Sequence, residues 1–145
     1  MKKISLLIAL LSISIFSNPK DQPNFVIIYV DDMGYADIGE FQDEKISTPN
    51  LDLMATNGQT WTNFYASSSV CTPSRAGLLT GILPVRIGLY GDQIAVFFPG
   101  SKTGIPKNQL TLAEVFQTNG YSTGIFGKWH LGDAKEFLPT RHGFD

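Results

Sequence analysis

The sequence contains the run Asn24-Phe25-Val26-Ile27-Ile28-Tyr29-Val30, which is followed at once by Asp31-Asp32-Met33-Gly34. The run is continuously apolar and rich in β-branched and aromatic residues, which is typical of a strand covered on both faces of a parallel sheet. Ligands of α/β proteins gather beyond the carboxyl ends of such strands, where the two acids lie. We therefore predict a buried strand that carries Asp31 and Asp32 to a functional site.

Helices and strands are predicted to alternate along the rest of the chain. Prolines in the first turn and glycines or asparagines after the last turn mark the helix ends. Helices are predicted near residues 48–57, 73–80 and 110–118, and further strands at residues 60–65 and 121–130. Residues 82–108 are rich in Gly and Pro and are expected to be irregular. This order predicts an α/β fold with a largely parallel sheet flanked by helices.

Composition is that of an ordinary globular protein. The chain has 145 residues, of which 43% are hydrophobic and 17% are charged, so a sizeable core is possible. The net charge is only -2 and the eleven basic residues are scattered. Nothing in this charge pattern indicates a nucleic-acid partner.

The N-terminus has the pattern of an export signal. Met1-Lys2-Lys3 precedes an apolar run from Ile4 to Phe16, which is too short for an ordinary transmembrane helix. We expect residues 1–17 to be a signal peptide and residues 18–23 to be a short exposed lead-in, with an uncleaved anchor as the alternative. In both cases we expect export to the periplasm or the cell exterior. If the signal peptide is cleaved, we expect no membrane attachment to remain.

Cys71 is the only cysteine, so it cannot form an internal disulfide, and a lone thiol in an exported protein needs an explanation. One interpretation is a small buried hydrophobe. Another is a nucleophilic cysteine, because Pro73 places Cys71 near a helix N-terminus. Arg75 follows one helical turn later and can hold an anion beside Cys71. A phosphatase-type phosphate cradle fits less well, because its arginine belongs where Gly77 stands.

The sequence resembles the formylglycine-dependent sulfatases of the arylsulfatase type. Four segments carry the resemblance in the order of that family: residues 24–34, Thr48-Pro49-Asn50-Leu51-Asp52, the signature Cys71-Thr72-Pro73-Ser74-Arg75 with Leu78-Leu79-Thr80-Gly81, and Gly127-Lys128-Trp129-His130-Leu131-Gly132. The resemblance covers Pro23 to Asp145. It implies an incomplete alkaline-phosphatase-like sulfatase fold, in which residues 24–145 are the N-terminal portion of the catalytic domain.

The resemblance implies that a formylglycine-generating or sulfatase-maturing enzyme oxidises Cys71 to formylglycine. The hydrated aldehyde has two hydroxyls on one carbon. One attacks sulfur to form a covalent sulfate ester, and the other loses its proton and expels sulfate as the aldehyde re-forms. The implied activity is a sulfuric ester hydrolase that acts on aryl or sugar sulfates.

A calcium ion is the cofactor that the resemblance implies, with Asp31, Asp32 and Cys71 as ligands. Taken alone, the two acids favour a solvated turn over a metal site. Two acids and one modified side chain also fall short of the roughly six to eight oxygen ligands that calcium takes.

Arg75, Lys128 and His130 complete the catalytic set that the resemblance implies. Arg75 steadies the hydrated aldehyde, while Lys128 and His130 also bind the sulfate group. Because Lys128 and His130 lie two apart in a predicted strand, we expect both on one face and Trp129 in the core. Without the family context Lys128 and His130 would be ordinary polar residues. His142 is expected to be structural.

Full-length sulfatases are several times longer and supply a further Asp-Asn or Asp-Gln pair, a second His and a second Lys. The 145 residues contain none of these, so we expect a fragment that is inactive alone. Two alternatives stay open. One is a phosphate or phosphonate ester hydrolase of the same superfamily, and the other is a non-catalytic exported remnant.

Overall fold

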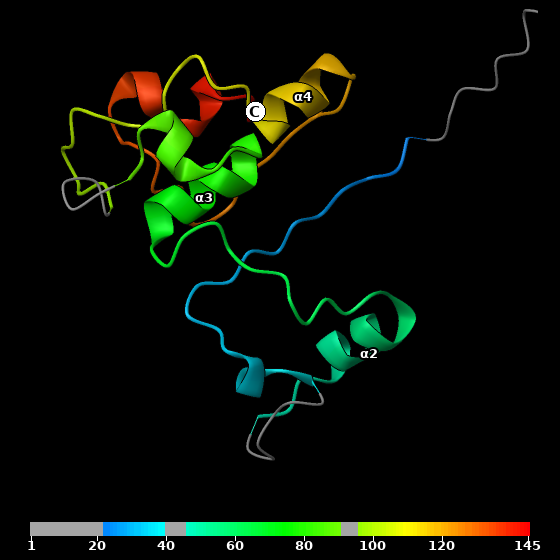
Figure 1. Cartoon of the computed structure of the whole chain (residues 1–145). Coiled ribbons are helices and arrows are strands. Elements are labelled where there is room, and N and C mark those ends of the chain that lie inside the picture. The colour runs from blue at the N-terminus through cyan, green and yellow to red at the C-terminus, as the bar shows by residue number, and fades with distance from the viewer. Residues whose placement is uncertain (1–21, 40–45, 91–95) are drawn as a thin grey trace, which may run out of the picture. The chain divides into compact units, whose positions relative to one another are not determined.

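The structure is a computed structural model that describes residues 22–39, 46–90 and 96–145. The chain divides into two units, Met1–Asp32 and Met33–Asp145. The predicted signal peptide and most of the lead-in lie outside the described residues. The described elements are α2 (Pro49–Asn57), α3 (Cys71–Thr80) and α4 (Leu112–Thr118), with the 3-10 turns η2 (Tyr35–Asp37), η4 (Pro84–Ile87), η5 (Lys135–Phe137) and η6 (Pro139–Arg141) (Figure 1).

Helix α3 begins two residues earlier than predicted, so Cys71 is its first residue and Pro73 lies in its first turn. It ends at Gly81, whose φ of 67° is left-handed and whose N–H donates to the carbonyl of Gly77 at 2.9 Å. A Cβ on Gly77 would overlap the hydroxyl of Ser67. The chain that leads into α3 therefore packs directly on the helix.

Helices α2 and α4 are also confirmed, and both have local start signals. Pro49 opens α2, and the side chain of Thr48 donates to that of Asp52 at 3.0 Å. Helix α4 begins with a capping box. In it, Thr111 accepts from the N–H of Glu114 at 3.2 Å, and the Glu114 carboxylate accepts from the N–H of Thr111 at 2.7 Å.

A small hydrophobic core forms against α3. Its buried members come from α3, from the irregular segment that follows and from the stretch before η5. They are Ala76, Ile87, Leu89, Phe97, Ile105 and Leu131, with Leu79, Ile82 and Trp129 packed against them. The described parts of residues 82–108 are irregular as predicted apart from η4, and they supply most of this core.

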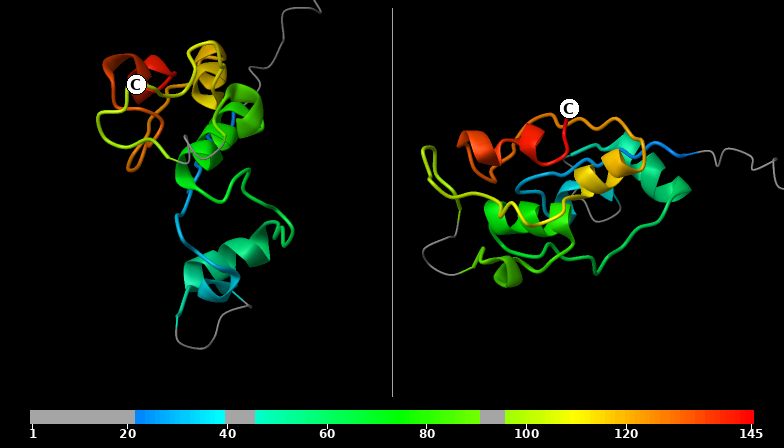
Figure 2. Two further views of the ribbon diagram at one scale, coloured as in Figure 1. Left: turned by 60° about the vertical axis from the view of Figure 1, so that its left-hand side comes forward. Right: turned by 90° about the horizontal axis from the view of Figure 1, so that it is seen from above.

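The last residues of the chain are fastened to α4, which also contacts α3 (Figure 2). The hydroxyl of Thr111 donates to the carbonyl of His142 at 2.8 Å. The carboxylate of Asp145 accepts from the N–H of Thr123 at 2.8 Å. A Cβ on Gly143 would overlap the backbone of Glu114, so this approach requires glycine.

The predicted parallel sheet is not confirmed, because the ranges 22–39, 46–90 and 96–145 contain no strand. Residues 60–65 include a turn, and the predicted strand 121–130 is interrupted by left-handed residues, Gly127 at φ 99° and His130 at φ 59°. A strand requires a continuous backbone ladder with a neighbour. The 121–130 segment instead bonds to the end of the chain, where the N–H of Asp145 donates to the carbonyl of Thr123 at 2.9 Å.

Residues 24–30 are irregular and exposed within their own unit, rather than a buried strand. Val26, for example, is 84% exposed. The run ends in a bend at Asp31 and Asp32, and Asp32 has a left-handed φ of 57°, which Asp tolerates better than most residues.

Candidate functional site

Cys71 is a half-buried free thiol at the first residue of α3. The Nζ of Lys128 donates to its Sγ at 3.2 Å, across 57 positions of sequence. The helix N-terminus and the ammonium both favour negative charge at this point. The structure therefore brings together two of the predicted catalytic residues.

Arg75 lies one turn along α3 and holds the backbone that carries the lysine. Its Nη1 donates to the carbonyl of Lys128 at 2.6 Å. The prediction that Arg75 shares a face with Cys71 agrees with this contact, since both side chains meet Lys128. Its predicted contact with a hydrated aldehyde stays a prediction.

His130 lies two residues beyond Lys128, in a backbone conformation that no strand would give it. Its φ of 59° shows that the expected strand alternation is the wrong reason for its direction. Its Nε2 lies 2.8 Å from the carbonyl of Phe97, a bond in which the ring donates. The buried Nδ1 has no hydrogen-bond partner among the described residues. In the neutral ring this nitrogen carries the lone pair.

Thr72 was missed by the sequence analysis, because it occupies a variable position of the signature. It is fully buried. Its hydroxyl donates to the carbonyl of His130 at 2.8 Å and accepts from the N–H of Phe97 at 3.1 Å. Both partners are backbone groups, so no residue type in the sequence could have indicated the contact.

Asp31 and Asp32 belong to the first unit, whereas Cys71 belongs to the second. Both side chains are exposed, and carboxylate oxygens are ligands that calcium prefers. Within the described ranges there is no group of three or more His, Cys, Asp or Glu side chains that could hold a metal ion. The pair thus fits calcium in its donor chemistry and could supply part of a coordination shell. The role of Cys71 as a third ligand stays a prediction.

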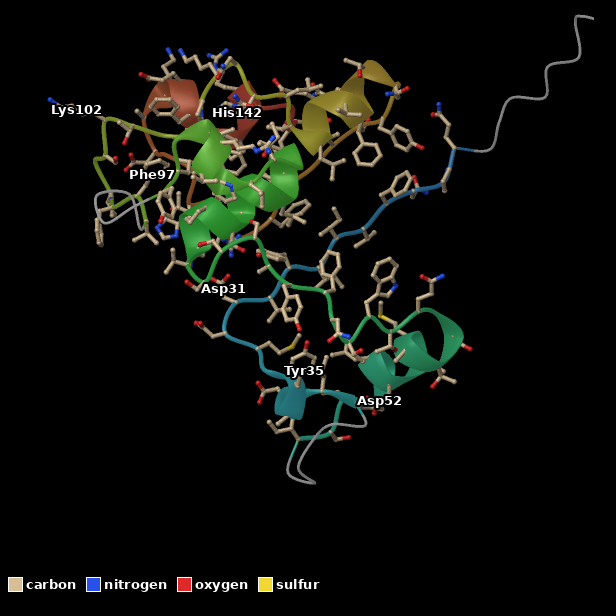
Figure 3. The ribbon with its side chains drawn as sticks, in the orientation of Figure 1. Asp31, Tyr35, Asp52, Phe97, Lys102 and His142 are labelled. Atoms are coloured by element: carbon tan, nitrogen blue, oxygen red, sulfur yellow. The ribbon has the colours of Figure 1, made fainter. Side chains whose placement is uncertain are left out.

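Trp129 and His142 have neighbouring rings, and Trp129 lies between the candidate site residues Lys128 and His130 in the sequence. Trp129 packs against the core and its Nε1 donates to the carbonyl of Phe137 at 2.8 Å, in agreement with the predicted core position. His142, labelled in Figure 3, is 2% exposed. Its ring centroid lies 5.9 Å from that of Trp129. Burial lowers the pKa of His142, and the nearby carboxylate of Glu114 partly opposes this effect.

No described helix has the length and apolarity that a membrane crossing demands. The site itself consists of a thiol at a helix N-terminus, an ammonium in contact with it, a guanidinium that binds the lysine backbone, and an imidazole with a lone pair. Such a set can bind an anionic group and stabilise negative charge that develops on it.

Comparison with known proteins shows that the chain is similar in sequence to sulfatases. A model of the sulfatase family matches residues 23–145. The chain is 52% identical over 124 residues to arylsulfatase A of Bos taurus, which covers 84% of this chain and 24% of the relative. It is 48% identical over 142 residues to arylsulfatase A of Homo sapiens, which covers 97% of this chain and 27% of the relative.

A solved structure, described as Ps i-CgsB in complex with k-i-k-neocarrahexaose, matches with a TM-score of 0.70 at 39% identity. The match covers 79% of this chain and 25% of that one. The fold of the described residues is therefore close to part of a solved protein. The chain spans about a quarter of the length of the relatives that it matches.

Proposed function

Because the chain belongs to the sulfatase family, we propose that its chemistry is the hydrolysis of sulfuric esters, with residue 71 as the nucleophile. The contact that carries this proposal is the 3.2 Å approach of Lys128 Nζ to Cys71 Sγ at the start of α3. A sulfate ester is anionic, and its oxygens gain charge in the transition state. An ammonium and a helix N-terminus beside the reacting residue stabilise that charge.

Cys71 acts after oxidation to formylglycine by a maturing enzyme. This group supplies a hydrated aldehyde that can take up sulfate and release it again. Lys128 then binds a sulfate oxygen. Arg75 keeps the lysine in place because its guanidinium donates to the backbone carbonyl of Lys128. Because the Nε2 of His130 donates to the carbonyl of Phe97, its Nδ1 carries the lone pair in the neutral ring and can accept a hydrogen bond from the reacting group.

Asp31 and Asp32 contribute carboxylate ligands to a calcium ion, which would polarise a sulfate oxygen when bound. Equilibrium dialysis with calcium tests this directly. Asp31→Asn and Asp32→Asn should each weaken calcium binding, whereas Asp133→Asn, a control acid that accepts from the N–H of Gly100 at 2.6 Å, should leave it unchanged. Equal binding by the wild type and the two ligand variants would remove Asp31 and Asp32 from the metal site.

The substrate class is an aryl or sugar sulfate. Aryl sulfates are supported by the arylsulfatase relatives. A carbohydrate substrate is supported by the solved relative that holds k-i-k-neocarrahexaose. We also propose that the protein is exported before it acts. N-terminal sequencing should then show that the mature protein begins at Asn18.

Hydrolysis of an aryl sulfate and of an aryl phosphonate by the protein purified from its own host separates the reaction classes. We expect the sulfate to be the better substrate and Cys71→Ala to reduce its turnover by about 10³-fold or more. Faster hydrolysis of the phosphonate would favour the phosphonate ester hydrolase instead. No turnover of either ester, together with an unmodified thiol at residue 71, would favour the non-catalytic remnant.

A further inference from the structure

Thr72 connects three segments at one buried point. Its hydroxyl donates to the carbonyl of His130 at 2.8 Å and accepts from the N–H of Phe97 at 3.1 Å. The carbonyl of Phe97 in turn accepts from His130 Nε2 at 2.8 Å. These three hydrogen bonds close a ring among Thr72, Phe97 and His130, beside the residue that carries the nucleophile.

Two side chains on one face of helix α3 bind the backbone of the segment from Lys128 to His130. Thr72 and Arg75 are three apart, so they are neighbours on the helix surface. Thr72 binds the carbonyl of His130, and Arg75 binds the carbonyl of Lys128. The stretch that presents Lys128 to Cys71 is thus fixed at both of its ends.

His130 needs this support because its φ of 59° is uncommon for a residue with a side chain. Such a conformation persists only where the surroundings over-determine it. The Thr72 hydroxyl is one of the groups that do so. Its removal would leave the His130 carbonyl and the Phe97 N–H without that partner, and both would favour a relaxed backbone.

We propose that Thr72 is a positioning residue, which holds the Lys128–His130 segment in register with Cys71 through the backbone of His130. The meaning of this role rests on the proposed function, but the geometry can be tested without turnover. The probe is the rate at which iodoacetamide alkylates unmodified Cys71 at one fixed pH. Lys128 Nζ donates to Sγ at 3.2 Å, and a neighbouring cation makes a thiol more reactive, so a displaced lysine slows the reaction.

Thr72→Val removes the hydroxyl and keeps the shape of the side chain, while Thr72→Ser keeps the hydroxyl. We expect Thr72→Val and Lys128→Met each to slow alkylation by roughly threefold to tenfold, and Thr72→Ser to stay within about twofold of the wild type. The double variant Thr72→Val with Lys128→Met should be no slower than Lys128→Met alone. A wild-type rate for Thr72→Val, or full additivity in the double variant, would overturn the proposal.

Amide hydrogen exchange tests the proposal on the wild-type chain, so that the test does not depend on Thr72→Val being able to fold. In the wild-type chain the N–H of Phe97 should be protected although it lies in an irregular segment, and rapid exchange there would overturn the proposal without any variant. In the host-derived enzyme, Thr72→Val should lower kcat for an aryl sulfate with KM little changed, and Thr72→Ser should restore it. Coupled alkylation, together with an unmodified Cys71 in the host-derived protein, would support the positioning role while rejecting the proposed function.

Discussion

Residues 24–30 and the core against α3 are both strongly apolar, yet only the core is buried. Val26 is 84% exposed in its unit, whereas Ala76 and Leu131 are fully buried in theirs. The core closes because side chains from residues 82–90, 96–105 and 129–131 pack against α3. The described part of the other unit, residues 22–32, holds no second layer. Apolar sequence therefore indicates a need for burial, while burial itself depends on a covering segment.

The largest expected effect comes from truncating one apolar side chain in each region. Leu131→Ala should lower the free energy of unfolding by about 2–5 kcal/mol, because it leaves a cavity in the core. Val26→Ala should change it by less than about 0.5 kcal/mol, because the side chain is exposed. Urea denaturation followed by circular dichroism measures both. Similar losses for the two variants would contradict the contrast.

Glycine substitutions sharpen the contrast within the second unit. Gly143 and Gly120 have nearly the same left-handed φ, 84° and 83°, but only Gly143 has backbone against the position of a Cβ. Gly143→Ala should cost about 2–4 kcal/mol from strain and overlap together, and Gly120→Ala about 1 kcal/mol from strain alone. Thermal unfolding of the two variants tests this ranking, and equal costs would mean that the contact of Gly143 with α4 is loose.

A smaller effect is expected from pH. Burial lowers the pKa of His142 below its ordinary value of 6.5, against the opposing charge of Glu114 and with the aid of Lys107. Above about pH 6.5 the ring is neutral in both states. As the pH falls further, the unfolded chain takes up the proton first, so stability falls until the pH reaches the folded pKa.

The expected slope is at most about 1 kcal/mol per pH unit. Urea denaturation between pH 8 and 5 measures it. His142→Gln should lose this part of the slope, whatever its stability at neutral pH. An unchanged slope in the variant would assign the pH dependence to other groups.

The three helices could be predicted because their signals are local. Pro49, Pro73 and the Thr111 capping box start them, and Gly81 ends α3 through a left-handed φ that glycine adopts without strain. The strands could not be predicted with the same success, because pairing depends on a neighbour far along the chain. The sequence pattern of residues 121–130 is the same as that of a strand, so it did not indicate that Gly127 and His130 have a left-handed φ.

The candidate site divides in a similar way. Lys128 and His130 were predicted from the family resemblance to bind the sulfate group, and that role stays a prediction. The 3.2 Å contact places Lys128 beside the residue that the resemblance gives as the nucleophile. The physical reason given, alternation along a strand, was wrong, since His130 is left-handed. Thr72 and Phe97 could not be found, because they act on backbone groups, and contacts of that kind leave no mark in residue type or spacing.

Mass spectrometry of residue 71 tests the central claim most directly. Trypsin should release Ile46–Arg75 as one peptide, which contains the only cysteine. In protein purified from its own host, we predict that residue 71 carries an aldehyde, reacts with a hydrazide and resists alkylation. A peptide that is fully alkylated at an unmodified Cys71 thiol would contradict the claim that this residue becomes the nucleophile.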